Sequence, residues 1–96
     1  MTQLMLKSNS SKEVIPLINE ALENEKRIIT TGIRRTERLL SDFENRYEMN
    51  SNEFFEKYQL GKLGDASEMI DWAGEYKILM KLKREYQQLR EVQICT

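Results

Sequence analysis

The sequence predicts an all-α fold in which two long helices form an antiparallel hairpin with a short helix at the hinge. The first observation is composition: charged residues make up 32% of the 96 residues and proline occurs once, a profile typical of helical proteins. The second is that apolar residues recur at helical spacing along two long stretches. The third is that three of the four glycines and the only tryptophan fall between Ser51 and Tyr76, among the clearest signals for helix starts and ends. We expect one domain over residues 1–96.

The first ten residues do not define one element. The run LMLK is compatible with a strand, a frayed helix or a tail, and SNSS is typical of a turn or linker. We therefore expect residues 1–10 to be flexible or to depend on a partner for their structure. Ser11 is a candidate N-cap, and Pro16 then falls near the first helical turn, where its missing N–H costs least.

The next stretch, residues 12–48, predicts one unusually long helix. Its apolar residues recur every eleven residues, which corresponds to about 3.67 residues per turn and gives an almost straight apolar stripe. A helix of this length is not stable on its own propensity, so the stripe needs a long partner. We expect it to support oligomerisation into a helical bundle as well as the hairpin. The candidate oligomerisation residues are Leu17, Ile18, Ile28, Ile29, Ile33, Leu39 and Leu40.

Gly32 allows two interpretations. A glycine inside a helix costs roughly 1 kcal/mol relative to alanine, so the helix could break at Thr30–Gly32. The phase of the apolar pattern continues unchanged across this position, however. We therefore favour a continuous helix with a close approach of another element at Gly32.

Two further helices follow, over residues 51–60 and 66–92. Asn50 is the expected cap of the short helix, with Glu53 at the capping-box position, and Ser51 is the alternative cap. Gly61 suits the left-handed position that ends this helix. The last helix is expected to start at Asp65 as its cap with Glu68 three residues later, and to leave a tail at 93–96. Its apolar stripe consists of Met69, Trp72, Tyr76, Leu79, Leu82, Tyr86 and Leu89.

The composition argues against an enzyme, a cofactor and a metal site. Histidine is absent, which removes the commonest general base and metal ligand. Carboxylate pairs such as Asp71 and Glu75 are typical of a solvated helix face, and GKLGD lacks the spacing of a phosphate-binding loop. The single cysteine, Cys95, cannot form a disulfide framework, which favours a reducing, cytoplasmic setting. No signal peptide or membrane-spanning run is present, so we expect no membrane association.

Charge is distributed in blocks along the chain. Bases dominate from Lys26 to Arg38 and again from Lys77 to Arg90, and acids dominate from Asp42 to Glu75. A hairpin would therefore have a basic middle and an acidic hinge end. The simplest interpretation is solubility, whereas the functional one is an acidic end that meets a basic partner. With a net charge of −1, direct binding of nucleic acid is not expected.

Aromatic residues cluster around the expected hinge. The more economical interpretation is a local core that fixes the turn, and the alternative is that part of the cluster stays exposed as an anchor for a partner. Aromatic anchors beside carboxylates would suit the basic surface of a protein that acts on nucleic acid. The candidate partner-binding residues are Phe55, Tyr58, Asp71, Trp72, Glu75 and Tyr76.

The run SNEFFEKYQLGKLGD, followed by IDWAGEY, resembles small helical proteins of prokaryotic toxin–antitoxin pairs. In those proteins an acidic segment capped by Ser or Thr, with an aromatic residue and a tyrosine, leads into a Gly-x-Leu-Gly-Asp turn. An acidic residue, a tryptophan and a tyrosine then follow; Asp71 stands here where glutamate is more frequent. The matching positions are Ser51, Glu53, Phe54, Tyr58, Gly61, Leu63, Gly64, Asp65, Asp71, Trp72 and Tyr76.

This resemblance, over about a quarter of the chain, implies a non-enzymatic cytoplasmic antitoxin-like protein that neutralises a toxin-like protein encoded beside it. The long first helix shows no ribbon-helix-helix or other DNA-binding pattern, so operator binding does not carry over. The alternative is a structural, homo-oligomeric coiled-coil or helical-bundle protein. It is favoured by helix lengths of about 54 Å and about 40 Å, which leave the first helix unmatched from Val14 to Leu22. A third interpretation, nucleic-acid binding through the basic blocks, ranks lower.

Overall fold

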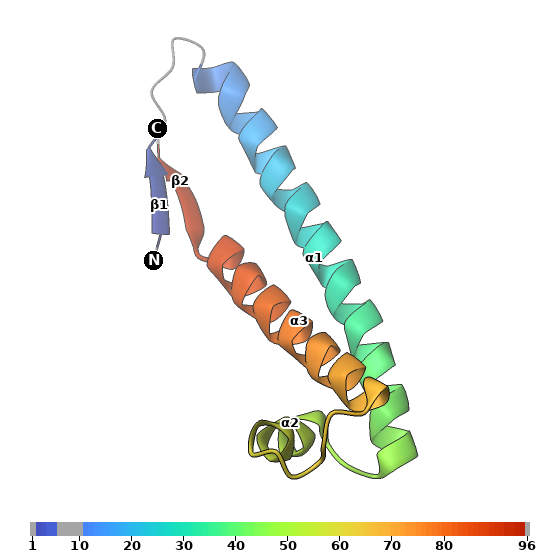
Figure 1. The fold of residues 1–96 in the computed structure, drawn as a ribbon. Coiled ribbons are helices and arrows are strands. Elements are labelled where there is room, and N and C mark those ends of the chain that lie inside the picture. The colour runs from blue at the N-terminus through green and yellow to red at the C-terminus, as the bar shows by residue number, and fades with distance from the viewer. Residues whose placement is uncertain (1, 6–10, 96) are drawn as a thin grey trace.

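The computed structural model describes residues 2–5 and 11–95 and has the expected helical hairpin. Helices α1 and α3 pack antiparallel, and the short α2 lies between them in sequence at the closed end (Figure 1). The molecule is elongated, with principal extents of 58 × 22 × 18 Å. The elements are β1 (Thr2–Met5), α1 (Ser11–Tyr47), α2 (Ser51–Gln59), α3 (Ser67–Arg90) and β2 (Val92–Cys95).

A two-stranded ribbon lies at the open end of the hairpin; the sequence left a strand near the amino terminus as one of three possibilities but did not predict its pairing with the end of the chain. Strands β1 and β2 pair in parallel, with Thr2 opposite Val92 and Met5 opposite Cys95 (Figure 1). The expected tail at 93–96 is therefore strand as far as Cys95. Residues 2–5 form strand β1, whereas residues 1 and 6–10 lie outside the described part of the chain, so the expectation that residues 1–10 are flexible or depend on a partner stays a prediction.

Helix α1 runs without a break through Gly32, as the unbroken apolar phase predicts. A Cβ atom at Gly32 would lie 3.1 Å from Cδ1 of Leu82 on α3, which is tighter than ordinary van der Waals contact. One turn further on, the buried Thr36 donates a hydrogen bond from Oγ1 to the carbonyl oxygen of Gly32 at 2.8 Å. The glycine therefore lets α3 approach the middle of α1.

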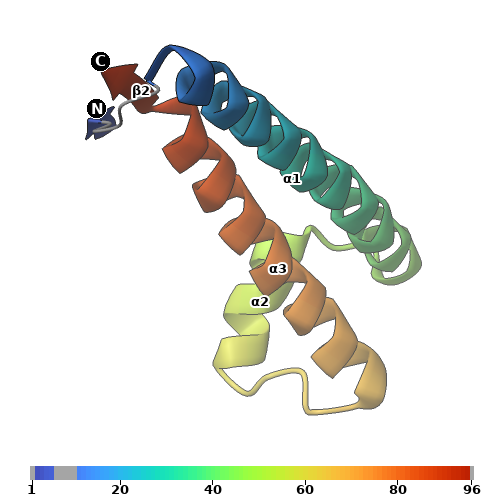
Figure 2. The same cartoon turned by 90° about the horizontal axis from the view of Figure 1, so that it is seen from above.

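The hydrophobic core is concentrated toward the hinge. Viewed from above, α2 lies beside α3, and it packs more extensively on α3 than on α1 (Figure 2). The buried residues of this cluster come from all three helices. They are Leu40, Phe54, Trp72, Ala73 and Leu79.

The end of α2 follows the expected glycine-terminated pattern. Gly61 has a φ of 74°, a left-handed conformation that costs glycine little. Its N–H donates to the carbonyl of Tyr58 at 3.0 Å, and the N–H of Lys62 donates to the carbonyl of Lys57 at 3.0 Å. This pair of bonds is a Schellman motif, which satisfies carbonyls that would otherwise lack partners at the helix end.

The helix starts differ from the expected caps. Asn50 is the N-cap of α2, but its side chain makes no capping hydrogen bond; instead Oε2 of Glu44, on α1, accepts from the backbone N–H of Ser51 at 2.8 Å. The expectation that Asp65 caps α3 is wrong. The N-cap is Ala66, and no side chain makes a capping bond there. The start of α3 lies one residue later than the sequence pattern suggested.

None of the described helices combines the length and the apolar character that a membrane span requires.

Candidate functional site

The hinge is built around Trp72, whose side chain is only 1% exposed. Its Nε1–H donates a buried hydrogen bond to Oγ of Ser51 at 2.9 Å, so the indole carries no unsatisfied polar atom into the core. The ring of Phe54 stacks on the indole with centroids 3.8 Å apart and planes inclined by 5°. The rings of Phe43 and Tyr47 on α1 stack at 5.5 Å and 5.6 Å. Aromatic side chains from all three helices thus meet at one buried indole.

Trp72 is therefore part of the core and does not present its ring to a partner in this fold. The same holds for Phe54, which is fully buried. Tyr58 stacks against Phe54 with centroids 5.6 Å apart and is half-buried. The burial and stacking of Trp72, Phe54 and Tyr58 agree with the interpretation that these aromatic residues form a local core.

Phe55 and Tyr76 are the two candidate contact residues that the fold brings together in a partly exposed position. Their ring centroids lie 5.0 Å apart, with planes inclined by 35°, and both side chains are half-buried. They line an open cleft of about 490 Å³. The other lining residues are Lys77, Met80, Lys81 and Arg84, all on α3. The aromatic rings and Met80 make the cleft apolar, and the three bases border it. A surface of this kind can bind an acidic segment of a partner.

The charge at this cleft has the opposite sign from the one expected at the hinge. Lys77 places its ammonium 5.9 Å from the centroid of the Phe55 ring, within range of a cation–π interaction. Lys81 and Arg84 continue along the same side of α3 and are exposed. The aromatic anchors are thus bordered by bases, although acids dominate this part of the sequence.

Asp71 and Glu75 lie on the other flank of α3. At about 100° per residue, they fall on one side of the buried Trp72 position, whereas Tyr76 and Met80 fall on the other. Asp71 is exposed and Glu75 is half-buried. Oε2 of Glu75 is buried, and no hydrogen-bond partner reaches it among the described residues. The candidate carboxylates and the candidate aromatic residues therefore do not form one continuous site.

A polar cluster that the sequence did not reveal ties the end of α1 to the start of α3. The hydroxyl of Tyr47 donates to Oε2 of Glu68, and Nη1 of Arg46 lies 3.1 Å from Oε1 of the same carboxylate. The hydrogen bond from Tyr47 holds the pKa of Glu68 below its ordinary value, and Arg46 adds to the effect. The same bond raises the pKa of Tyr47. Residues 21 positions apart meet here, and only the fold shows it.

The candidate oligomerisation residues divide between two faces of α1. Ile29 and Leu40 are buried, each only 4% exposed, and are used within the hairpin. Leu17 and Ile28 are 64% and 57% exposed, and Leu39 is half-buried. Ile18 and Ile33 are half-buried, and Ile33 packs against the core cluster. The eleven-residue repeat thus supplies one stripe that is covered within the hairpin and a second that is exposed at Leu17 and Ile28 and half-buried at Leu39.

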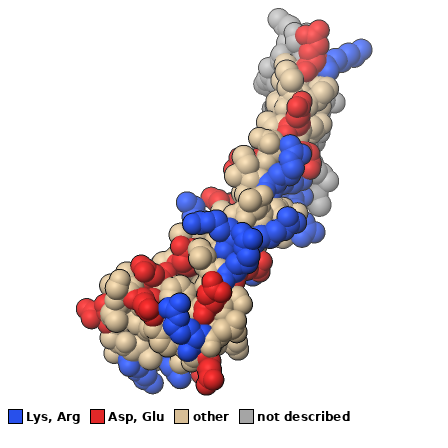
Figure 3. All heavy atoms as spheres, turned by 90° about the vertical axis from the view of Figure 1, so that its right-hand side faces the viewer, with Lys and Arg blue, Asp and Glu red and all other residues tan. Residues whose placement is uncertain are grey.

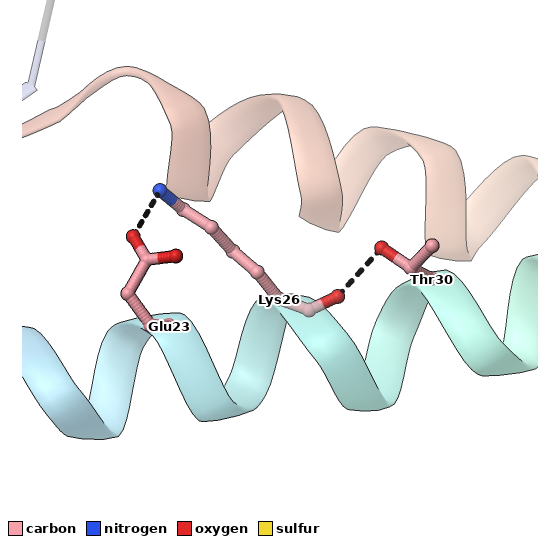
Figure 4. A network of polar contacts seen from close by, with 3 residues as sticks. All are labelled: Glu23, Lys26 and Thr30. Carbon is pink, nitrogen blue, oxygen red and sulfur yellow. Dashed lines mark hydrogen bonds and ion pairs between the residues drawn. The ribbon is translucent and has the colours of Figure 1, made fainter.

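Basic side chains gather over the middle of the molecule on the face that Figure 3 shows, with acidic side chains interspersed. One basic side chain of α1 is paired within the helix: Nζ of Lys26 lies 3.2 Å from Oε1 of Glu23, one turn earlier (Figure 4). The hydroxyl of Thr30 donates to the carbonyl of Lys26 at 2.7 Å in the same network. Interleaved charges of this kind suit a solvated helix face better than a phosphate-binding surface.

Within residues 2–5 and 11–95 no group of three or more potential metal ligands comes together. Comparison of the chain with protein-family models, with curated proteins and with solved structures gives no match.

Proposed function

We propose that this chain is a non-enzymatic, antitoxin-like protein-binding module that neutralises a partner protein encoded nearby. The observation that carries the proposal is the Phe55–Tyr76 pair, half-buried in an open cleft between α2 and α3. Aromatic side chains in such positions are typical binding hot spots, because they bury a large area without losing much conformational freedom. The resemblance of the hinge sequence to antitoxin-like proteins supports the same function.

The rigid core beneath the cleft supports this assignment. Tyr76 lies one turn after Trp72, which is fixed by its stacking on Phe54 and its bond to Ser51. The anchors are therefore held in place before any partner arrives, so that binding need not order them. We place the primary contact at Phe55 and Tyr76, with Lys77 and Lys81 as charged neighbours, and Asp71 and Glu75 as a separate acidic flank.

The test is binding of the purified protein to the product of the gene that lies beside its own, measured by calorimetry. Phe55→Ala and Tyr76→Ala should each weaken binding by about tenfold or more. Leu60→Ala is the matched control, since Leu60 is 69% exposed and lies outside the cleft. Unchanged binding by both cleft variants, with helicity retained, would place the contact elsewhere. An absence of binding by the wild-type chain would exclude the neutralising function.

The acidic flank has its own test. Reversing the charges of Asp71 and Glu75 together should weaken binding if the partner also covers this side of α3. Reversing Lys77 and Lys81 tests the cleft edge in the same assay. If only the reversal of Lys77 and Lys81 weakens binding, the partner surface is acidic. If only the reversal of Asp71 and Glu75 weakens binding, the partner surface is basic.

The second candidate function is a structural homo-oligomer, and a specific observation favours it. α1 has 37 residues and α3 has 24, so about 20 Å of α1 extends past the helix that covers it. Leu17, in this extension, is 64% exposed. Sedimentation equilibrium of the wild-type chain tests this candidate, which predicts a species larger than the monomer at micromolar concentration.

A further inference from the structure

We propose that two copies of this chain pair through the outer face of α1, antiparallel and with Ile28 of each copy at the twofold axis. The inference rests on the self-association named above as the second candidate function, and it adds the surface and the geometry.

The apolar part of this surface is the outer stripe, which we define as Leu17, Ile28 and Leu39. At about 100° per residue, the stripe lies roughly a quarter turn from Ile29 and Leu40, the buried residues that face the hairpin. Leu17 and Ile28 are 64% and 57% exposed. These two large aliphatic side chains lie three turns apart along one line of the helix. They form an exposed apolar seam that a second helix can cover.

The spacing of the outer stripe fits an antiparallel copy of itself. Leu17 and Leu39 each lie eleven residues from Ile28, about 16.5 Å along the helix axis. A twofold axis through Ile28 therefore sets Leu17 of each copy against Leu39 of the other. Because an eleven-residue repeat keeps the seam nearly straight, all three contacts can form along one pair of helices.

The charges beside the stripe favour the same arrangement. Glu20 and Arg38 lie on the same flank of the stripe, one on each side of Ile28 in sequence, and both are exposed. In the antiparallel pair, Glu20 of one copy lies within about two residues' rise of Arg38 of the other, and the contact occurs twice. Arg35, closer to the seam, adds a second cation near the same carboxylate.

A parallel pair is disfavoured by the same residues. It would set Arg35 of one copy beside Arg35 of the other at the seam, and like charges at close range oppose association. Glu20 and Arg38 of the two copies would lie on opposite sides of the seam, so the pairing between them would be lost. The antiparallel pair would also cover the part of α1 that the shorter α3 leaves exposed. It sets the amino-terminal part of each α1, including the turns that extend past α3, beside the hinge half of α1 in the other copy.

Cysteine cross-linking tests the geometry directly. With Cys95 replaced by serine, Ala21→Cys and Arg35→Cys occupy positions that the antiparallel pair sets opposite each other. A mixture of the two variants should form the mixed disulfide dimer much faster than either variant forms a dimer with itself. A parallel pair would give the reverse pattern, with fast homodimers of each variant, and would overturn the proposal.

Surface variants test the residues. Ile28→Glu should convert the dimer to a monomer in sedimentation experiments, while the matched control Ile78→Glu, at a residue 46% exposed on α3, should leave it intact. Glu20→Arg and Arg38→Glu should each weaken the dimer by about three- to tenfold at low salt, and the double exchange should restore it. Circular dichroism checks that each variant remains helical.

The outcomes separate the geometry from self-association itself. A wild-type dimer that gives no mixed cross-link, or that survives Ile28→Glu, uses another surface and overturns the proposal while self-association stands. A wild-type chain that stays monomeric overturns both. If that monomer binds the neighbouring gene's product and Ile28→Glu abolishes the binding, the stripe serves that partner and not a second copy.

Discussion

The indole N–H of Trp72 donates to the hydroxyl of Ser51 at 2.9 Å, and this bond joins the start of α2 to the middle of the aromatic core. Both residues are buried, at 1% and 5% exposure. The backbone N–H of Ser51 is bound separately by Glu44 on α1. One serine therefore connects all three helices, through its side chain to α3 and through its backbone to α1.

Replacing Ser51 with alanine should lower the free energy of unfolding by about 1–3 kcal/mol, because the buried indole N–H would lose its acceptor. The backbone bond to Glu44 does not depend on the side chain and should remain. Denaturant unfolding followed by tryptophan fluorescence measures the change. Ser41→Ala, at an exposed position on α1, is the control and should change stability little. Equal effects of the two variants would contradict a structural role for the bond.

The two helical glycines should respond differently to alanine. Gly74 has no atom within 4 Å of the position that a Cβ would take, so Gly74→Ala should stabilise the protein by about 0.5–1 kcal/mol. At Gly32 the new Cβ would lie 3.1 Å from Cδ1 of Leu82, so that Gly32→Ala should gain less or lose stability. Thermal unfolding of both variants measures the difference. Equal gains would show that Leu82 moves aside without cost.

The start of α3 offers a stabilising change. Because Ala66 is the N-cap and makes no side-chain bond, Ala66→Ser should supply the missing acceptor and stabilise the protein by about 1 kcal/mol. Asp65→Ala should change the melting temperature little, since Asp65 lies outside the cap. If Asp65→Ala instead lowered the free energy of unfolding by about 1 kcal/mol, Asp65 would be the cap after all.

The Tyr47–Glu68–Arg46 cluster predicts a dependence of stability on pH. The lowered pKa of Glu68 means that its carboxylate stabilises the fold above the pKa of the unfolded state, about 4.3, and that this contribution is lost as pH falls through the lower, folded value. Glu68→Gln should therefore lower the melting temperature at neutral pH and converge with the wild type in acid. Glu56→Gln, on the exposed side of α2, controls for the loss of one charge. A constant difference at every pH would contradict the assignment.

The features that the sequence predicted are those that depend on local pattern. The unbroken apolar phase across Gly32 predicted a continuous α1, and Gly61 predicted the end of α2, because helix periodicity and left-handed glycine are properties of neighbouring residues. The convergence of Phe55 and Tyr76 followed from the hinge. The sequence also suffices to place Asp71 and Glu75 on one side of Trp72 and Tyr76 on the other, because the angle of about 100° per residue fixes their positions around the helix.

The remaining features depend on residues that only the fold brings together. Glu44 caps α2 from the preceding helix, and Tyr47 finds Glu68 across the hinge; neither pairing has a sequence signal. Lys77 and Lys81 border the cleft, whereas the sequence pattern predicted that their basic block would lie in the middle of the hairpin. Their position next to Phe55 follows from how α2 folds back on α3.

The β1–β2 ribbon sets an order of events for folding. Contacts near the hinge, such as the one between Tyr47 and Glu68, join residues 21 positions apart and close comparatively small loops. The pairing of Thr2 with Val92 instead joins the two ends of the chain, and closing so long a loop in the unfolded chain carries a larger entropic cost. The ribbon should therefore form only after α1 and α3 have brought the ends together. In hydrogen exchange, the amides of β2 should open while those of α3 around Trp72 stay protected, and either end of the chain can then be released without unfolding the helices.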